Sequence, residues 1–257
     1  MLRTVSAAAV LLATACAPAD RDADGATDAA PLLVLAASDL QLVLPEIASA
    51  FEARTGERVE VVLGSTGNLA TQIENGAPAD VFLAAHEQFV ERLQRGGHVH
   101  EETRRVYALG RLALVWRPGV PAPADAAALA SAAYRTVAIA NPEHAPYGAA
   151  ARQALESAGA WETVRPRLVL AENVAQALQF VRTGNADAGI VALGTIAGQD
   201  IPHRAVDASE HAPLRQAGVV VRGSRRPEAA AAFLAELTGP GAQEVFLRLG
   251  FEAPDAP

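Results

Sequence analysis

Lysine is absent from this chain of 257 residues, so arginine supplies all 21 of the basic side chains that oppose 29 acidic ones. The net charge of −8 and an aromatic content of 5% exclude a nucleic-acid groove, which needs clustered basic residues and stacking rings. One cysteine excludes both a disulfide framework and a Cys-based zinc site. The longest apolar run, Thr4 to Ala17, is shorter than the ~20 residues of a membrane-spanning helix. We therefore expect a globular protein with a sizeable hydrophobic core.

The first residues have the pattern of an export signal. Arg3 supplies a positive charge, an apolar stretch of small residues follows, and the single cysteine, Cys16, stands where cleavage would fall. The segment before it resembles a bacterial lipobox, which implies that Cys16 is lipidated; an ordinary buried cysteine is the alternative. Residues 17–31 are rich in Ala, Asp and Pro and predict a flexible tether. The sequence thus predicts a signal peptide over residues 1–16 and an exported protein, in the periplasm or at the cell surface, anchored to a membrane by lipid.

After the tether, apolar strand patterns alternate with helical patterns. Strands are predicted at 32–37, 58–64, 79–85, 111–117, 135–140, 167–171, 188–193 and 217–223. Helices are predicted at 39–55, 68–75, 87–95, 147–158, 174–183, 227–237 and 239–248. This alternation favours an α/β fold with mostly parallel sheets flanked by helices. We expect two lobes, one formed by residues 32–110 plus 215–257 and the other by residues 111–214, with a ligand cleft between them.

Hydroxyl and amide side chains gather at four turns where a strand is followed by a helix. They are Ser38, the pair Ser65 and Thr66 between two glycines, the loop 141–148, and the turn 172–174. A helix N-terminus presents unpaired N–H groups and a partial positive charge, so it binds anions without a basic side chain. The alternative is that each residue is an ordinary helix cap. Taken together, the turns predict a small oxyanion held between lobes by neutral donors.

These turns lie in segments that resemble the molybdate-binding proteins of bacterial ABC importers. The resemblance runs in order over about residues 32–252, and its most specific pieces are NGAPADVFLAA (75–85) and NPEHAPYG (141–148). It implies a two-lobed periplasmic binding protein fold of the type II class. It also implies a monomer that needs no cofactor, is not an enzyme, binds molybdate or tungstate, and delivers the oxyanion to a membrane permease.

Position by position, the resemblance assigns the oxyanion donors to both lobes. Ser38 and Ser65 match hydroxyl donors of the first lobe, with Thr66 and Asp39 as further candidates beside them. Tyr147 and Val174 match the contributors of the second lobe, Val174 through its backbone N–H.

Two positions depart from the family pattern. Ala192 stands where some members have Tyr, and the ring at Tyr147 stands where those members have a small residue. Asp39 would place a carboxylate beside a dianion unless only its N–H is used.

Other functions remain open at this point. The same fold could bind sulfate, phosphate, ferric ion or an organic acid, and a lipoprotein could present a ligand rather than transport it. A Ser-dependent hydrolase built on Ser65 and a His is a weaker alternative, because no Gly-x-Ser-x-Gly elbow is present. The pair His98 and His100 lies in a polar turn without other metal-ligating residues nearby, so we expect no site for a free cation.

Overall fold

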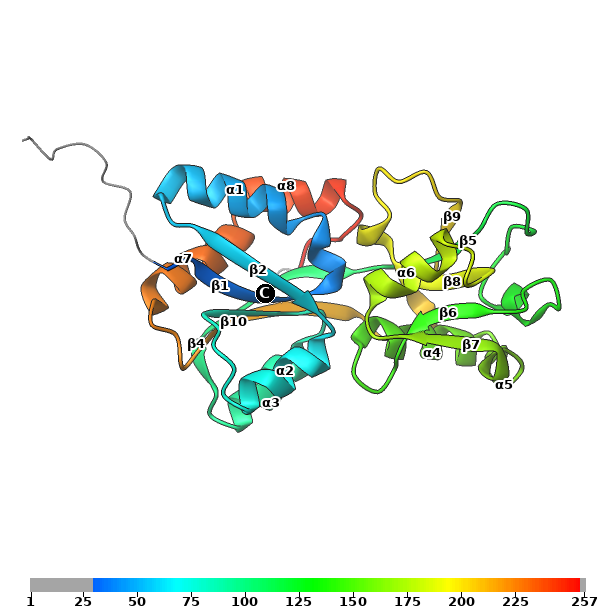
Figure 1. The fold of residues 1–257 in the computed structure, drawn as a ribbon, viewed down its shortest axis with the longest axis horizontal. Helices are drawn as coiled ribbons and strands as arrows, with labels where there is room; N and C mark the ends of the chain where they lie inside the picture. The colour runs from blue at the N-terminus through cyan, green and yellow to red at the C-terminus, as the bar shows by residue number, and fades with distance from the viewer. Residues whose placement is uncertain (1–29, 255–257) are drawn as a thin grey trace, which may run out of the picture. The chain divides into compact units, whose positions relative to one another are not determined.

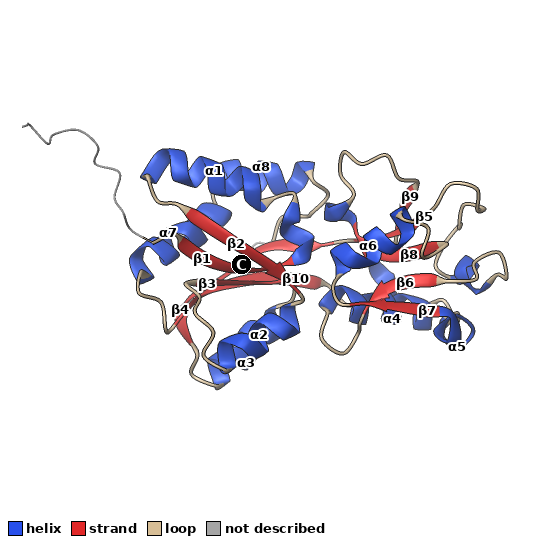
Figure 2. Cartoon of the chain, viewed as in Figure 1, coloured by secondary structure: helices blue, strands red, loops and turns tan. Residues whose placement is uncertain are grey.

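The computed structural model describes residues 30–254, which form two five-stranded sheets with helices packed on them (Figures 1 and 2). The expected signal peptide 1–16, the lipidated Cys16 and nearly all of the expected tether lie outside the described residues. Within residues 30–254, no helix combines the length and the apolar character that crossing a membrane requires.

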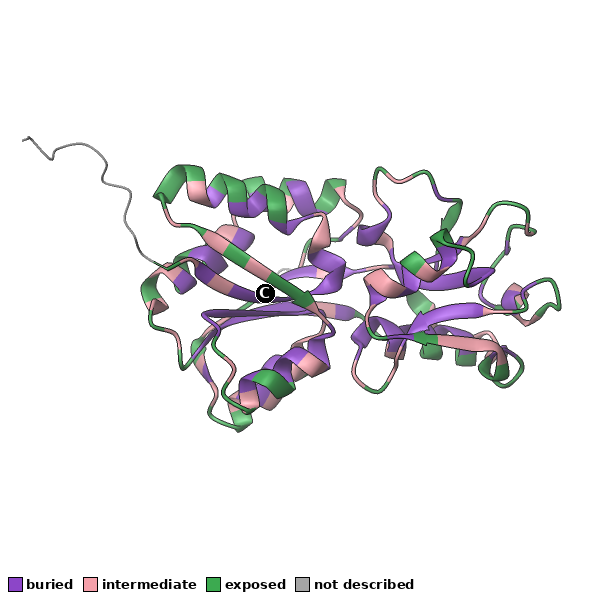
Figure 3. Cartoon of the chain, in the orientation of Figure 1, coloured by how far each residue is buried: buried purple, intermediate pink, exposed green. Residues whose placement is uncertain are grey.

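The first sheet contains the strands from both ends of the described chain. Its strands, in spatial order, are β2 (Val59–Gly64), β1 (Leu32–Ala37), β3 (Val81–Ala84), β10 (Leu214–Val221) and β4 (Val99–Gly110). Strand β1 pairs in parallel with β2 and β3, whereas β10 pairs antiparallel with β3 and β4. Strands β1 and β3 are buried almost throughout (Figure 3), which accounts for their unbroken apolar sequences.

Helices cover both faces of this sheet. Figure 1 shows α1 (Leu44–Thr55), α7 (Pro227–Leu237) and α8 (Pro240–Arg248) on one face. It shows α2 (Thr66–Glu74) and α3 (Glu87–Arg95) on the other. The helices bury one apolar stripe each, and aromatic rings join them to one another and to the sheet: Phe51 of α1 meets Phe233 of α7 edge to face, with ring centroids 5.2 Å apart. The fold thereby fixes the carboxyl ends of β1 and β2, from which two of the predicted site loops leave.

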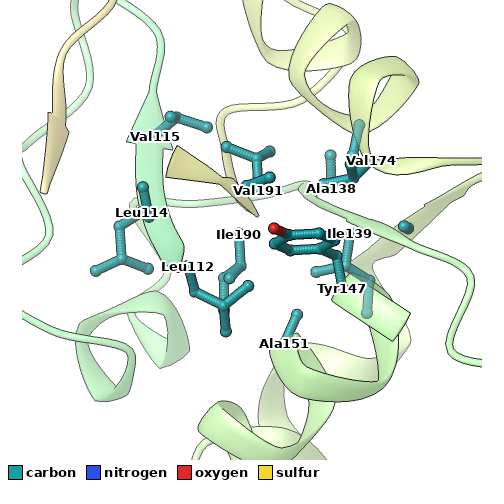
Figure 4. Close-up of a cluster of buried hydrophobic side chains, with 14 of the residues drawn as sticks. Leu112, Leu114, Val115, Ala138, Ile139, Tyr147, Ala151, Val174, Ile190 and Val191 are labelled. Atoms are coloured by element: carbon teal, nitrogen blue, oxygen red, sulfur yellow. The ribbon is translucent and has the colours of Figure 1, made fainter. Parts of the chain in front are cut away.

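The second sheet is formed by the middle of the chain. Its strands, in spatial order, are β7 (Leu168–Ala171), β6 (Val137–Ala140), β8 (Ala188–Ala192), β5 (Leu112–Trp116) and β9 (His203–Ala205). Helices α4 (Pro146–Ser157), the short α5 (Trp161–Val164) and α6 (Val174–Arg182) accompany it. Figure 4 shows its core, where Leu112, Ile139 and Ile190 from the strands meet Ala151 of α4 and Val174 of α6.

Both sheets are mixed rather than mostly parallel. In the second sheet β6 pairs in parallel with β7 and β8, but β5 pairs antiparallel with β8 and β9. The strand alternation predicted the parallel part of each sheet correctly. The antiparallel part comes from β10 and β5, which begin where the chain passes between the sheets and are not reached through a crossover helix.

Two local differences from the sequence prediction have clear causes. The helix expected over residues 39–55 is a 3-10 helix η1 (Ser38–Gln41) followed by α1, because Pro45 has no N–H to donate and suits only the first turn of a helix. Strand β4 lies at the sheet edge and was not predicted, because residues 100–105 are all polar and none of them is buried.

The chain passes from one sheet to the other over very short segments. Only Arg111 separates β4 from β5, and the return leads from the 3-10 helix η5 (Ala208–Glu210) into β10. The C-terminal segment lies beside the first crossing, since Leu109 pairs with Glu252 through both backbone N–H groups. Arg111 also forms an ion pair with Glu252.

Candidate functional site

Ser38 follows β1 directly and begins the 3-10 helix η1. Its side chain is buried, and the residue before it, Ala37, provides no side-chain cap. The backbone N–H of Ala175, in the first turn of α6, donates to Ser38 Oγ over 3.4 Å. The hydroxyl from the first sheet therefore meets a helix start that belongs to the second sheet.

Ser65 precedes α2 at the carboxyl end of β2, in the position of a helix cap. It nevertheless makes no side-chain capping bond. Its hydroxyl instead donates to the backbone carbonyl of His144, 2.8 Å away, in the loop before α4. The interpretation of Ser65 as an ordinary cap is therefore wrong. The neighbouring Thr66 has an internal role, because its Oγ1 accepts a hydrogen bond from the backbone N–H of Ala85 over 3.2 Å.

The glycine after Thr66 permits a close approach between the two lobes. The backbone N–H of Gly67 donates to the carbonyl oxygen of His144 over 2.8 Å. A Cβ atom at Gly67 would lie 2.6 Å from that same oxygen, which is closer than side chains tolerate. The Gly-Ser-Thr-Gly loop thus approaches the backbone of the facing loop.

The second sheet contributes the first turns of α4 and α6. Gly148 lets α4 pack on the end of β6, since a Cβ there would lie 2.1 Å from the carbonyl oxygen of Ala140. Next to it, the buried Tyr147 packs its ring beside the hydrophobic cluster of the second sheet (Figure 4), while its hydroxyl reaches Asp39 beyond the first sheet's β1. In α6 the Asn173 side chain caps the helix by accepting from Gln176 N over 3.0 Å, and the buried Val174 is the first helical residue.

The ends of β1 and β2 and the starts of α4 and α6 line one narrow cavity. The structure thereby brings together all six residues that the sequence singled out for the oxyanion: Ser38, Asp39, Ser65, Thr66, Tyr147 and Val174. No arginine is among the residues that line it, so the described lining is neutral except for Asp39. Ala192, at the end of β8, is buried but does not line this cavity.

Asp39 is fully buried and has no cationic partner among the described residues. Its Oδ2 accepts hydrogen bonds from the hydroxyl of Tyr147 over 3.1 Å and from Nε2 of Gln216 over 2.5 Å. Burial raises the pKa of Asp39 to about 6, against the opposing effect of these two donors and of its own backbone N–H. Burial likewise raises the pKa of Tyr147, helped by the nearby Asp39 charge, so the phenol keeps its proton.

Gln216 is a site residue that the sequence did not reveal. It lies on β10, fully buried, and its Nε2 also approaches the Tyr147 hydroxyl at 3.0 Å. A single Gln at the start of an apolar strand carries no motif, and only the antiparallel placement of β10 brings it to Asp39.

A wider surface hollow adjoins the cavity at Asn173. Most of its lining comes from the side of α6, including Gln179 and Arg182, and Gln41 of η1 lies opposite. The small cavity is the better candidate for an anion, because the starts of η1, α2, α4 and α6 meet at it, whereas the hollow meets the start of α6 and then follows the side of that helix.

Ser65 and His144 lie as close as a nucleophile and its base, with Oγ 2.8 Å from Nδ1. The single hydroxyl proton of Ser65 is directed to the His144 carbonyl, however, which leaves the imidazole as the donor in the second contact. Within residues 30–254 no acidic side chain is hydrogen-bonded to His144, so the third member of a catalytic triad is missing. The same part of the chain has no group of three or more His, Cys, Asp or Glu side chains that could hold a metal ion.

Comparison with known proteins gives a consistent result. Over residues 32–252 the chain matches the family of bacterial extracellular solute-binding proteins. It is 38% identical to the molybdate-binding protein ModA of Azotobacter vinelandii, over 88% of this chain and 91% of the relative. It is 29% identical to YvgL of Bacillus subtilis (strain 168), a putative ABC transporter substrate-binding lipoprotein, over 86% of each chain.

Solved structures agree with the sequence relatives. The periplasmic molybdate-binding protein of Azotobacter vinelandii matches with a TM-score of 0.81 at 34% identity, over 87% of this chain and 100% of that one. The two-lobed periplasmic binding protein fold is thereby confirmed, as is the prediction that the chain is a binding protein and not an enzyme. This chain therefore belongs to the bacterial extracellular solute-binding protein family and is a relative of the ModA proteins within it.

Proposed function

We propose that this protein captures molybdate or tungstate in the interlobe cavity and delivers it to the permease of an ABC importer. The observation that carries the proposal is the convergence of neutral donors from both lobes on one small cavity without a basic side chain. Relatives that cover most of the chain and are named as molybdate-binding proteins support the choice of oxyanion.

The donors are the hydroxyls of Ser38 and Ser65 and the N–H groups at the starts of α4 and α6, including that of Val174. A buried dianion needs about seven or more hydrogen bonds, an estimate from the acceptor capacity of four oxygens. In the present conformation the Ser65 hydroxyl and the Gly67 N–H are both directed at His144. Binding would therefore exchange these bonds between the lobes for bonds to the oxyanion.

Movement of two lobes would admit and enclose the oxyanion. We assign residues 32–110 plus 215–257 to one lobe and 111–214 to the other, following the division of strands between the sheets. The hinge would lie at Arg111 and at the segment before Leu214, where the chain changes sheets. Because few backbone torsions lie in these short crossings, a rigid-body closure is the expected motion.

Selectivity would rest on size and protonation. Sulfate carries the same charge and the same four oxygens, so only the dimensions of the cavity separate it from the larger molybdate and tungstate ions. Phosphate keeps a proton near neutral pH, and a cavity that offers mainly donors would leave that proton unpaired, at a cost of about 1–3 kcal/mol.

Export and anchoring complete the proposal. The lipobox-like segment that ends at Cys16 and the named lipoprotein YvgL among the relatives support a lipid anchor. A protein that is held beside its permease would need no second copy to bind its ligand, so we propose a monomer.

Thermal unfolding in the presence of four oxyanions tests the proposed ligand. An ion that binds only the folded state adds about 2.7 kcal/mol of stability at a hundredfold excess over its dissociation constant. We expect molybdate and tungstate to raise the midpoint of unfolding by several degrees, with sulfate and phosphate at equal concentration giving little change. A rise with sulfate alone would favour a sulfate-binding protein on the same fold.

A further inference from the structure

Asp39 is the one acidic side chain among the described residues that line the cavity. It is fully buried, and within residues 30–254 its side-chain partners are the neutral Tyr147 and Gln216. An ionised carboxylate at this position would stand beside a bound dianion with no cation to offset either charge. Repulsion between the two negative charges would then weaken binding of the dianion.

The two oxygens of Asp39 have different surroundings. Oδ2 accepts from two donors, Tyr147 and Gln216, which leaves little room for a proton on that atom. Oδ1 is buried and has no hydrogen-bond partner within the described part of the chain. A carboxylic acid protonated on Oδ1 would keep both existing bonds and gain a free donor.

We propose that Asp39 takes up a proton on Oδ1 when the oxyanion binds. The resulting O–H group donates a hydrogen bond to an oxygen of that ion. Capture of one dianion then consumes one proton from solution, and the buried charge of the site is that of the dianion alone. This inference rests on the proposed oxyanion function. It makes Asp39 an oxyanion-binding residue whose protonation is coupled to binding.

The surroundings of Asp39 favour this protonation. Tyr147 of α4 and Tyr107 of β4 are the titratable groups near it, and burial keeps both phenols protonated. Gln216 of β10 is neutral, and among residues 30–254 no charged side chain shifts the pKa of Asp39, which burial raises to about 6. A dianion in the cavity would raise that pKa further, because it opposes a second negative charge.

The pH dependence of affinity follows from these two protonation states. Above about pH 6 the free protein has lost the Asp39 proton, and the complex regains it. Between the two pKa values the dissociation constant should therefore rise about tenfold for each pH unit. Molybdate carries no proton in this range, so the slope would come from the protein.

The test is calorimetric titration of the ligand-free protein with molybdate between about pH 6.5 and pH 9, in buffers of different ionisation enthalpy. We expect uptake of about one proton per oxyanion at pH 7.5 and a tenfold weakening per pH unit. Asp39→Asn supplies a permanent donor of the same shape, so it should bind with an affinity independent of pH and exceed the wild type at pH 9. Glu101→Gln removes one charge from an exposed carboxyl on β4, outside the oxyanion turns, and should keep the wild-type slope.

The outcomes are distinct. Tight binding with no proton uptake and no slope overturns the role of Asp39 and leaves the oxyanion function standing. The same slope in Asp39→Asn also overturns it, because the titrating group must then be elsewhere. No binding of molybdate or tungstate at any pH overturns the proposed function and this inference with it.

Discussion

The hydroxyl of Ser65 donates to the backbone carbonyl of His144, 79 residues away in sequence and 2.8 Å away in space. The two residues belong to different lobes, so this bond fastens the first lobe to the second beside the cavity. It also explains why Ser65 leaves its own helix uncapped. The same hydroxyl would donate to an oxyanion oxygen once its bond to the His144 carbonyl is broken.

Ser65→Ala should weaken molybdate binding by about 1–3 kcal/mol, because a charged acceptor would lose a donor in a buried site. Calorimetric titration of the variant measures the change. Ser49→Ala, on an exposed position of α1, is the matched control and should bind as the wild type does. Unchanged affinity in Ser65→Ala would remove this hydroxyl from the site.

Gly67→Ala should hinder closure of the lobes, since its Cβ would lie 2.6 Å from the His144 carbonyl. We expect weaker molybdate binding and a larger radius of gyration by small-angle X-ray scattering than the wild type shows under the same conditions. Gly241→Ala in α8 is a suitable control, because a Cβ there meets nothing within 4 Å. If Gly67→Ala scatters and binds like the wild type, the close approach of the two loops has no part in closure.

Asp39 should make the ligand-free protein less stable as the pH rises. Its folded-state pKa of about 6 lies above the ordinary 3.8, so the folded state holds the proton more tightly than the unfolded state does. The stability from this group is therefore fully present below about pH 3.8 and is lost as the pH rises to about 6, an effect of about 3 kcal/mol.

Urea unfolding of the wild type and of Asp39→Asn at about pH 5 and pH 8 measures this linkage. The variant cannot lose a proton, so its stability relative to the wild type should be greater at pH 8 than at pH 5. Equal differences at both pH values would show that Asp39 does not titrate between them.

Cys16→Ser should move the protein from the membrane fraction to the soluble fraction of cells that export it, because a serine cannot carry the lipid thioether. Fractionation followed by immunoblotting provides the measurement. Retention of the variant with the membranes would contradict the lipid anchor and would leave the oxyanion site unaffected.

The sequence revealed the parts of this site that lie at strand ends. Ser38 follows a continuous apolar strand, Ser65 follows a strand of mainly apolar residues, and both precede helical patterns, so their place at a common edge of the first sheet could be predicted from local periodicity. The start of α6 was equally visible, because Val174 follows an Asn that caps the helix.

Other parts depend on contacts that no local pattern encodes. The bond between Ser65 and His144 requires the two lobes to face each other. Gln216 reaches Asp39 only because β10 enters the first sheet antiparallel, a pairing that the helix–strand alternation does not indicate. Strand β4 escaped detection because its half-exposed edge position permits a polar sequence.

Calorimetric titration of the ligand-free protein with molybdate, tungstate, sulfate and phosphate near pH 7 measures which oxyanion the cavity binds. We predict tight binding of molybdate and tungstate with one oxyanion per chain, and weak or undetectable binding of sulfate and phosphate. Binding of sulfate alone, or of none of the four, would contradict this prediction: the fold and the cavity would stand, but the assignment of that cavity to molybdate would be lost.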